Sequence, residues 1–400
     1  MKKIIEVTRI ILISILIGVI LGIAGALFYL CISGATAIRQ AHPQFLILLP
    51  VGAVLVTLLY QLFKNEDDGG TNRVLESAYS NAPVSLKMAP SIFLSTVFSH
   101  LCGASVGREG AALQLGGSLG YNTARLFHLS DREKSFCTCI GMSACFSSLF
   151  GTPMAAAIFS IEIAVVGRLN VLCLVPSVIA SYISRLIARS VGAPDMKMKM
   201  DKATTADPVT LLKVTVIAVS CGLVAMLFCR LLSDGVKLTS LKLKNKYLRA
   251  LILGSAVFAL SLIFPGQTYN GAGVDQIAGF MKGDVLPWQF ALKMLFTLIS
   301  VYAGYKGGEI VPAFYIGASL GAFLGHLLGL PPALACSVGM VSLFCGVTNC
   351  PLTAFAIGIE IFGTGTAPFF LLASAFSFFF SGKAGLYSSQ KRQVYRAVSD

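Results

Sequence analysis

The chain has 400 residues, of which 56% are hydrophobic and only 12% are charged, and its mean hydropathy is +0.79. Soluble globular domains are about one quarter charged, so this chain has too little polar surface to coat a water-soluble body of its size. The composition therefore excludes soluble enzymes, disordered regulators and secreted disulfide scaffolds, and it predicts an integral membrane protein.

The formal net charge is +13, from 31 Lys and Arg against 18 Asp and Glu. The basic residues gather at segment ends, at Lys2 and Lys3, in 237–249 and in 391–396. No stacking aromatics interleave these runs, so we do not expect nucleic-acid binding. Basic flanks of membrane segments face the cytoplasm. We therefore predict a multi-pass protein of the plasma membrane with both termini cytoplasmic and an even number of crossings.

The first apolar segment runs from Ile10 to Ile32 without the alternation that a barrel strand requires, so it predicts helices. Its basic start and the small residues at 24–26 imitate a signal peptide, but the apolar run is longer than a signal core. We expect a retained first helix and an all-α membrane fold.

Further apolar segments follow along the chain, and several are too short to cross a bilayer, which takes about 20 residues. Short segments interrupted by Gly and Pro are typical of helices that end inside the membrane and line a site there. The expected segments are 9–32, 44–63, 88–101, 111–127, 134–150, 153–166, 170–190, 209–232, 247–264, 287–304, 311–329, 332–347, 351–363 and 367–381.

An internal repeat divides the chain. Gly141, Pro153 and Glu162 recur 198 residues later as Gly339, Pro351 and Glu360, and GGSLG at 116–120 recurs as GASLG at 317–321. The alternative is a chance recurrence of small residues on helix-packing faces. We predict one membrane transport domain over 1–400, built from an inverted pair of halves. Its expected parts are the halves 9–190 and 209–387, a linker 191–208 and a short cytoplasmic tail 388–400.

Ionisable residues inside apolar segments are functional candidates, because burying a charge in hydrocarbon is costly. Glu109 and Glu309 each follow a glycine-bearing turn and start a long apolar helix, where free N–H groups and the helix dipole favour an anion. No His or Cys cluster has metal-ligand spacing, so we expect neither a metal nor a cofactor. The full candidate set is Arg108, Glu109, Glu162, Lys306, Glu309 and Glu360.

Three ordered motifs carry a family resemblance. GREGA at 107–111 resembles the GREGP motif of the CLC family of chloride channels and proton-coupled antiporters, and GGEIVP at 307–312 is similar to its GxFxP motif. GKAGLYS at 382–388 resembles the segment that bears the family's central tyrosine. The resemblance implies a CLC-like inverted repeat, a homodimer in the lipid bilayer, and a transporter or channel rather than an enzyme.

The resemblance also implies residue roles. Glu109 takes the place of the gating glutamate, which competes with the anion and carries the proton, and Tyr387 takes the place of the tyrosine facing the central anion. Burial beside an anion favours protonation of a carboxylate, so anion entry and proton uptake are linked. The expected anion-binding positions are Gly70, Thr71, Asn72, Gly107, Gly110, Ile310, Val311 and Tyr387.

Several positions depart from the chloride pattern. In the segment 68–73, Gly70 replaces the serine whose hydroxyl holds chloride, and Ile163 stands where chloride antiporters have their inner proton glutamate. Ala111 and Ile310 replace a proline and a phenylalanine of the motifs, and Glu309 adds a carboxyl. This combination resembles the fluoride/proton antiporter branch of the family, CLC-F.

Fluoride is small and strongly hydrated, so a site that strips its water needs strong hydrogen-bond donors, and a protonated carboxyl is one. Glu109 and Glu309 together would couple an inward proton to an outward anion. We predict export of cytoplasmic fluoride in exchange for protons. The alternative is a chloride/proton antiporter or a chloride channel of the same family.

Each candidate also has a structural interpretation. Arg108 either neutralises a carboxylate or attracts anions, Lys306 either snorkels or pairs with Glu309, and Glu109 either gates or lies in a solvated loop. For Asn72 the choice is between binding the anion and capping a helix that begins near Arg73. Glu162 and Glu360 are expected to cap helices or lie at the interface, and Tyr387 has an interfacial alternative.

Two other classes of protein fit the sequence less well. An intramembrane hydrolase is suggested only superficially by Ser105 in GASV, because no suitable histidine follows. A receptor or a purely structural protein does not explain paired buried glutamates.

Overall fold

The computed structural model describes residues 2–65, 69–198, 200 and 205–393. Nearly all regular structure in these ranges is α-helical, and the expected all-α membrane fold is confirmed. Short 3₁₀ turns lie at Pro43–Leu48, Val171–Cys173 and Thr364–Thr366, and two short strands are β1 (Val165–Val166) and β2 (Lys391–Arg392). The helices are α1 (Lys2–Ala41), α2 (Leu49–Leu62), α3 (Thr71–Ser80), α4 (Met88–Cys102), α5 (Glu109–Leu126), α6 (Asp131–Phe150), α7 (Pro153–Glu162), α8 (Leu174–Ser190), α9 (Pro208–Lys242), α10 (Lys246–Ile263), α11 (Val274–Phe280), α12 (Gln289–Tyr302), α13 (Ile310–Leu328), α14 (Pro332–Thr348), α15 (Pro351–Phe362) and α16 (Ala367–Ser381).

Each apolar segment expected from the sequence contains a helix, although many of the expected bounds differ from the observed ones. Helix α1 extends to Ala41 and α9 extends to Lys242, because polar residues continue both helices beyond their apolar cores. Helix α7 ends at Glu162 because the next residues turn into strand β1. No apolar segment in the expected set corresponds to α3 or α11, which are short and partly polar and so carry no hydropathy signal. Helix α3 is the short helix that was expected near Arg73 as an alternative partner of Asn72.

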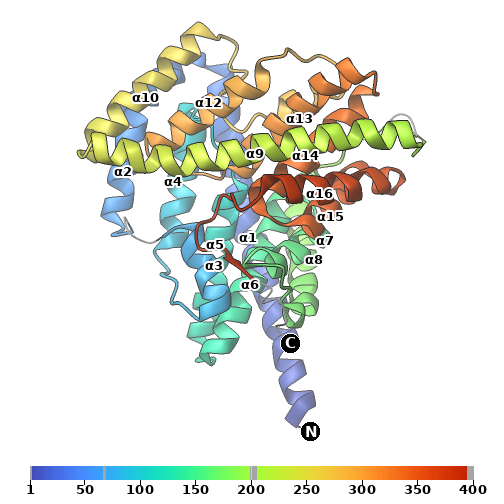
Figure 1. Ribbon diagram of the computed structural model, residues 1–400. Helices are drawn as coiled ribbons and strands as arrows, with labels where there is room; N and C mark the ends of the chain where they lie inside the picture. Colours follow the sequence, from blue (N-terminus) through green and yellow to red (C-terminus); the bar gives the residue numbers. More distant parts are fainter. Residues whose placement is uncertain (1, 66–68, 199, 201–204, 394–400) are drawn as a thin grey trace, which may run out of the picture.

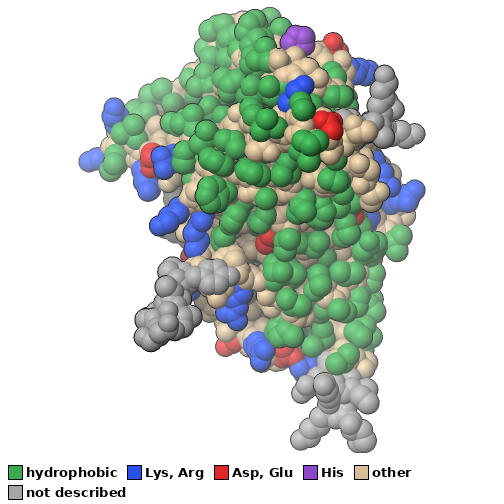
Figure 2. All heavy atoms as spheres, turned by 45° about the vertical axis from the view of Figure 1, so that its right-hand side comes forward, with side chains coloured by type: hydrophobic (Ala, Val, Ile, Leu, Met, Phe, Trp, Pro, Cys, Tyr) green, Lys and Arg blue, Asp and Glu red, His purple; other side chains and the backbone are tan. Residues whose placement is uncertain are grey.

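The outer surface is that of a membrane protein. Within the described residues, seven helices are long and apolar enough to cross a bilayer. Large apolar side chains such as Leu172, Leu186 and Phe379 are well exposed. Figure 2 shows one face on which apolar side chains form a nearly continuous surface, with Lys and Arg mainly toward its margins. The chain is therefore a multi-pass membrane protein.

Two pairs of helices cross closely at glycines. Helices α5 and α6 meet at Gly116 and Gly141, where a Cβ on either residue would lie well inside van der Waals contact of the other's carbonyl oxygen. Helices α13 and α14 meet in the same way at Gly317 and Gly339. Small residues allow such approach between membrane helices. In Figure 1, α6–α8 lie mainly in the lower half of the molecule and α9, α10, α12 and α13 in the upper half.

Two glutamates cap each other's helices. Glu162, near the end of α7, accepts hydrogen bonds from the backbone N–H groups of Leu352 and Thr353 at the start of α15, at 2.9 and 2.8 Å. Glu360, near the end of α15, accepts from Met154 and Ala155 at the start of α7, at 3.0 and 2.8 Å. Each carboxylate satisfies N–H groups that a helix start leaves free. The capping interpretation of both glutamates is confirmed.

The segment after α16 folds back across the molecule. Strand β2 pairs in parallel with β1, and the Gln390 side chain donates to the carbonyl oxygens of Ile163 and Thr348, both at 2.8 Å. Parts of three predicted regions lie outside the described residues: 199 and 201–204 of the linker, 394–400 of the tail, and Asp68. The division into halves remains a prediction.

The reciprocal caps predict a loss of stability in Glu162→Ala. Glu162 is 5% exposed, and its removal leaves the buried N–H of Thr353 without its partner, at a cost of about 1–3 kcal/mol. We expect the apparent melting temperature in detergent to fall by a few degrees, as measured by size-exclusion chromatography of heated samples. Glu76→Ala, at a side chain that is 38% exposed, is the matched control. Equal melting temperatures for the two variants would contradict the capping account.

Candidate functional site

The loops that precede α5 and α13 are joined at two glycines. The N–H of Gly107 donates to the carbonyl oxygen of Gly308 at 2.5 Å, and the N–H of Gly308 donates to the carbonyl oxygen of Gly107 at 2.8 Å. We call this pair of bonds the glycine bridge. It fixes the starts of the two helices beside each other, and with them Glu109 and Glu309.

The glycine bridge leaves no room for side chains. A Cβ on Gly308 would clash with the backbone nitrogen of Gly110, and a Cβ on Gly307 would lie 2.7 Å from the carbonyl oxygen of Gly107. A Cβ on Gly107 would lie 3.0 Å from the carbonyl oxygen of Gly308. The glycines of both motifs are thus required for close backbone approach.

Glu109 is the first residue of α5, and its side chain is fully buried. Its carboxylate accepts from the backbone N–H of Arg108 at 3.1 Å and lies 3.4 Å from the Arg108 Nε. The solvated-loop interpretation of Glu109 is therefore wrong, because the glycine bridge and the packed helices enclose it. Arg108 neutralises this carboxylate and also lies 5.0 Å from the ring centre of Tyr29.

Glu309 lies immediately before α13 and is partly buried. Its Oε2 is 3.6 Å from the position that a Cβ on Gly110 would occupy, so the carboxyl faces the start of α5. It makes no side-chain cap of its own helix. The ammonium group of Lys306 lies 4.3 Å from the ring centre of Tyr60 and within electrostatic range of Glu309.

Tyr387 approaches the same place from the segment after α16. Its ring is 6% exposed, and its hydroxyl oxygen has no hydrogen-bond partner among the described residues. Both Glu109 and Glu309 lie within electrostatic range of this hydroxyl. The interfacial interpretation of Tyr387 is wrong, because the side chain is buried. An unpartnered buried hydroxyl is available to donate to an anion.

The start of α3 also borders the site, beside the start of α5. Gly70 precedes the helix with φ +55° and ψ −132°, a conformation that disfavours the serine of the chloride pattern. The Thr71 hydroxyl lies 3.4 Å from the Gly110 carbonyl oxygen and accepts from Gln114 at 3.0 Å. Sequence reasoning missed Gln114, although a lone glutamine in an apolar helix is a signal. Its Oε1 has no partner among the described residues.

Asn72 has a different structural task from the one expected. The short helix expected near Arg73 is α3, which begins at Thr71, so Asn72 lies inside it and does not cap it. Its side-chain oxygen accepts from the backbone N–H of Ser389 at 3.0 Å, and its carbonyl oxygen accepts from the Ser389 hydroxyl at 2.9 Å. This contact fastens the Tyr387 segment to α3. Anion binding by Asn72 stays a prediction.

Backbone N–H groups are the remaining donors. Ile310 and Val311 open α13 with side chains that are fully buried, and Gly110 is the second residue of α5. The first N–H groups of a helix have no partner within it and carry its positive dipole end. Two such ends, two carboxyls and one phenol therefore converge, an arrangement suited to a small anion and a proton.

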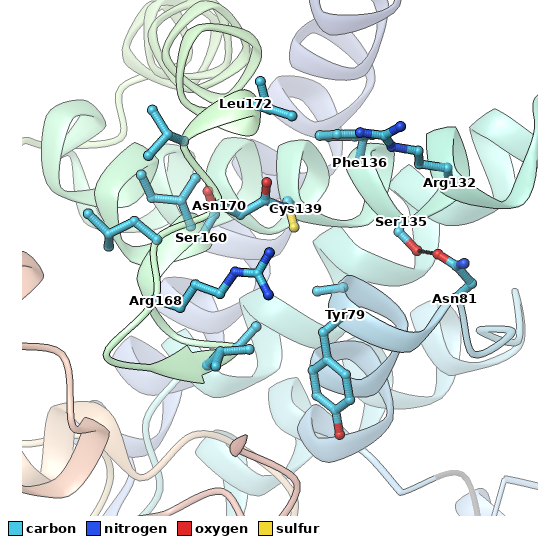
Figure 3. A pocket seen from close by; sticks show the side chains of 16 residues that line it. Tyr79, Asn81, Arg132, Ser135, Phe136, Cys139, Ser160, Arg168, Asn170 and Leu172 are labelled. Atoms are coloured by element: carbon cyan, nitrogen blue, oxygen red, sulfur yellow. Dashed lines mark hydrogen bonds between the residues drawn. The ribbon is translucent and has the colours of Figure 1, made fainter. Parts of the chain in front are cut away.

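A cavity of about 470 Å³ lies away from the central site, between α3, α6 and the end of α7. Figure 3 shows Arg168 extending into it, with Tyr79 and the hydrogen-bonded pair Asn81 and Ser135 along its wall. Its charged lining residues are arginines, and no carboxylate lines it. The nearby Ile163 is fully buried. This part of the protein thus offers no acidic group for an inner proton route among its lining residues.

The hydrolase alternative has no catalytic arrangement. The Ser105 hydroxyl is buried and hydrogen bonds to the hydroxyl of Thr297 at 2.9 Å, not to a histidine base. A nucleophilic serine needs such a base in contact. The fold and the site define a membrane transporter or channel for small anions.

Comparison with known proteins agrees. The family model described as "Voltage gated chloride channel" matches residues 52–382. A chloride/fluoride channel protein of Pseudomonas syringae pv. tomato is 33% identical over 383 residues, covering 94% of this chain and 85% of the relative. The H(+)/Cl(−) exchange transporter ClcA of Vibrio vulnificus is 23% identical and covers 86% and 80%. The crystal structure of a CLC-type fluoride/proton antiporter superposes with a TM-score of 0.94 at 28% identity, covering 97% and 99%.

The chain therefore belongs to the voltage-gated chloride channel (CLC) family of anion channels and anion/proton transporters. Members of this family are channels and transporters and not enzymes.

The glycine bridge predicts that Gly308→Ala abolishes transport, because the new Cβ collides with the start of α5. Gly34→Ala is the control, since nothing lies within 4 Å of its added Cβ. Anion flux per reconstituted protein, with folding checked by gel filtration, is the measurement. Full flux in Gly308→Ala would show that the bridge is dispensable.

Proposed function

We propose that this protein is a fluoride/proton antiporter that exports cytoplasmic fluoride in exchange for inward protons. Glu109 is the gate that competes with the anion and carries the proton. Glu309 is the second central carboxyl, and Tyr387 faces the anion together with the backbone at Ile310 and Val311. The remaining anion-binding positions are Gly70, Thr71, Asn72, Gly107 and Gly110.

The observation that carries this proposal is the placement of Glu309 against Gly110, one residue from the gate. When protonated, its carboxyl donates a strong hydrogen bond to an incoming fluoride and replaces water that the ion gives up. When ionised, it repels the anion and releases it. The two carboxyls thereby alternate between holding a proton beside fluoride and excluding fluoride, and this alternation couples the two fluxes.

The alternative is a chloride/proton antiporter or a chloride channel. Gly70 and its backbone conformation argue against it, because no hydroxyl is present there to hold chloride. The buried Ile163 also argues against the inner proton route of chloride antiporters.

The cellular arrangement is part of the proposal. The protein lies in the plasma membrane with both termini cytoplasmic, because basic residues flank both ends. It functions as a homodimer with one ion pathway per subunit, a proposal that rests on the family. The halves 9–190 and 209–387 form one transport domain, which the matching glycine crossings support.

Reconstituted liposomes test the substrate. We expect fluoride efflux, followed with a fluoride electrode, to be much faster than chloride efflux from matched liposomes. Equal rates for the two ions would sink the fluoride assignment.

Glu109→Gln tests the gate. A carboxamide cannot carry the proton, so we expect proton flux, followed with a pH probe, to drop to the level of protein-free liposomes. Asp131→Asn, at a side chain that is 75% exposed, should keep wild-type proton flux. An unchanged proton flux in Glu109→Gln would remove it from the mechanism.

Glu309→Gln tests the second carboxyl. The amide retains the shape of the side chain but does not alternate between donor and anion. We expect coupled fluoride turnover to fall about tenfold or more, as estimated from the loss of one charge-assisted hydrogen bond. Fluoride turnover equal to that of the wild type would leave Glu309 with no transport role.

A further inference from the structure

The cavity between α3, α6 and the end of α7, which we call the arginine cavity, takes no part in the proposed transport. Figure 3 shows Arg168 extending into it, with Arg132 beside Phe136 on another part of its wall. Within the described ranges, no carboxylate comes within 4 Å of either guanidinium. Arg132 instead lies 5.8 Å from the ring centre of Phe136. Two arginines that share a cavity without a counter-ion suit an anion with several oxygen atoms, such as a phosphate.

An apolar groove of about 450 Å³ continues from the arginine cavity. The cavity and the groove share Arg132, Phe136 and Leu172 as lining residues. Among the described residues that line the groove, the one carboxylate is that of Glu133, and it is already paired with Arg9. The rest of the groove is mainly apolar and comes from α1, α6 and the start of α8, with Ile10, Ile13, Leu129, Cys137, Ile140 and Pro176. The pair of cavities therefore fits a ligand with an anionic head and an apolar tail.

The groove runs from a charged level of the protein to an apolar one. Helix α1 is charged up to Arg9 and carries no charge over 10–38, and α6 begins with the charged residues 131–134 and carries none after them. The ion pair between Arg9 and Glu133 joins the two charged ends. Arg132 belongs to the same charged level. Lipid phosphates lie at such a boundary, and their acyl chains extend into the apolar part.

We propose that the arginine cavity and the groove together bind one anionic phospholipid, with its phosphate between Arg132 and Arg168 and an acyl chain along the groove. The planar guanidinium groups match the oxygens of a phosphate, and basic pockets between membrane helices are suited to anionic lipid headgroups. This site does not depend on which anion the protein transports. The cytoplasmic leaflet is assigned to it by the proposed cytoplasmic N-terminus.

The walls of the arginine cavity also hold the segment that carries Tyr387. The Tyr79 hydroxyl donates to the carbonyl oxygen of Ser389 at 3.0 Å, and the ammonium group of Lys391 lies 4.3 Å from the Tyr79 ring centre. Strand β1, at the edge of the cavity, pairs with β2 in the same segment. A phosphate bound to Arg168 fixes the loop after β1 and so steadies this pairing. Anionic phospholipid therefore activates transport by keeping Tyr387 in place.

Native mass spectrometry of the detergent-solubilised protein tests the binding without any transport. We expect phosphatidylglycerol to bind about tenfold or more weakly to the double variant Arg132→Gln/Arg168→Gln, through loss of charge-assisted contacts. Both side chains are exposed, so the fold should persist. Lys134→Gln removes a charge from the same helix but outside both cavities, where Lys134 pairs with Asp131 at 2.9 Å. It should bind like the wild type. Equal phosphatidylglycerol binding by the wild type and the double variant would overturn the site.

A second variant separates a lipid from a free phosphate. Leu172 is 70% exposed and lines both the cavity and the groove. We expect Leu172→Gln to weaken phosphatidylglycerol binding about threefold or more, through lost apolar contact, and excess inorganic phosphate not to displace the lipid from the wild type. Unchanged lipid binding in Leu172→Gln, or displacement by inorganic phosphate, would show that the cavity takes the free anion and would overturn the lipid assignment.

Fluoride efflux tests the activation, which rests on the proposed function. We expect the wild type to be faster in phosphatidylcholine liposomes that contain phosphatidylglycerol than in pure phosphatidylcholine, and Arg132→Gln/Arg168→Gln to lose this gain. Lys134→Gln should keep it. The surface charge of the liposomes acts on all three proteins alike. An equal gain in the double variant and the wild type would overturn the activation. Absence of fluoride efflux in both kinds of liposome would instead contradict the proposed function, while the binding measurement still decides the site.

Discussion

The pair of hydrogen bonds between Gly107 and Gly308 is the contact on which the rest of the site depends. Both loops lie inside the protein, where their backbone N–H and C=O groups have no water to bind. The two loops must therefore hydrogen bond to each other. Only glycine permits the approach. The consequence is that two helix N-termini, from distant parts of the sequence, begin side by side with a carboxyl on each.

The same need to satisfy free helix ends recurs elsewhere. The carboxylates of Glu162 and Glu360 accept hydrogen bonds from the N–H groups at the starts of α15 and α7, so both residues have a structural role. At the central site, Glu309 makes no such cap, and Tyr387 has an unpartnered hydroxyl. Groups that are left without protein partners beside free N–H ends are the ones available to an ion. This contrast separates the glutamates that hold the fold together from those that we propose to transport.

Much of the fold could be predicted because hydropathy reports burial in a bilayer directly. The apolar segments, the glycine-bearing motifs and the two helix-start glutamates were all visible in the sequence. The short helix α3 was expected only as the helix that Asn72 could cap and not from hydropathy, since tertiary contacts such as Asn72 with Ser389 stabilise it and an apolar pattern does not.

Coupling is the central claim, and a pH measurement in potential-clamped liposomes tests it most directly. Liposomes loaded with fluoride, with equal pH on both sides and the membrane potential held at zero, let fluoride run out down its gradient. The account predicts that protons are drawn in and that the lumen acidifies. A lumen that stays neutral or becomes alkaline while fluoride leaves would contradict fluoride/proton exchange.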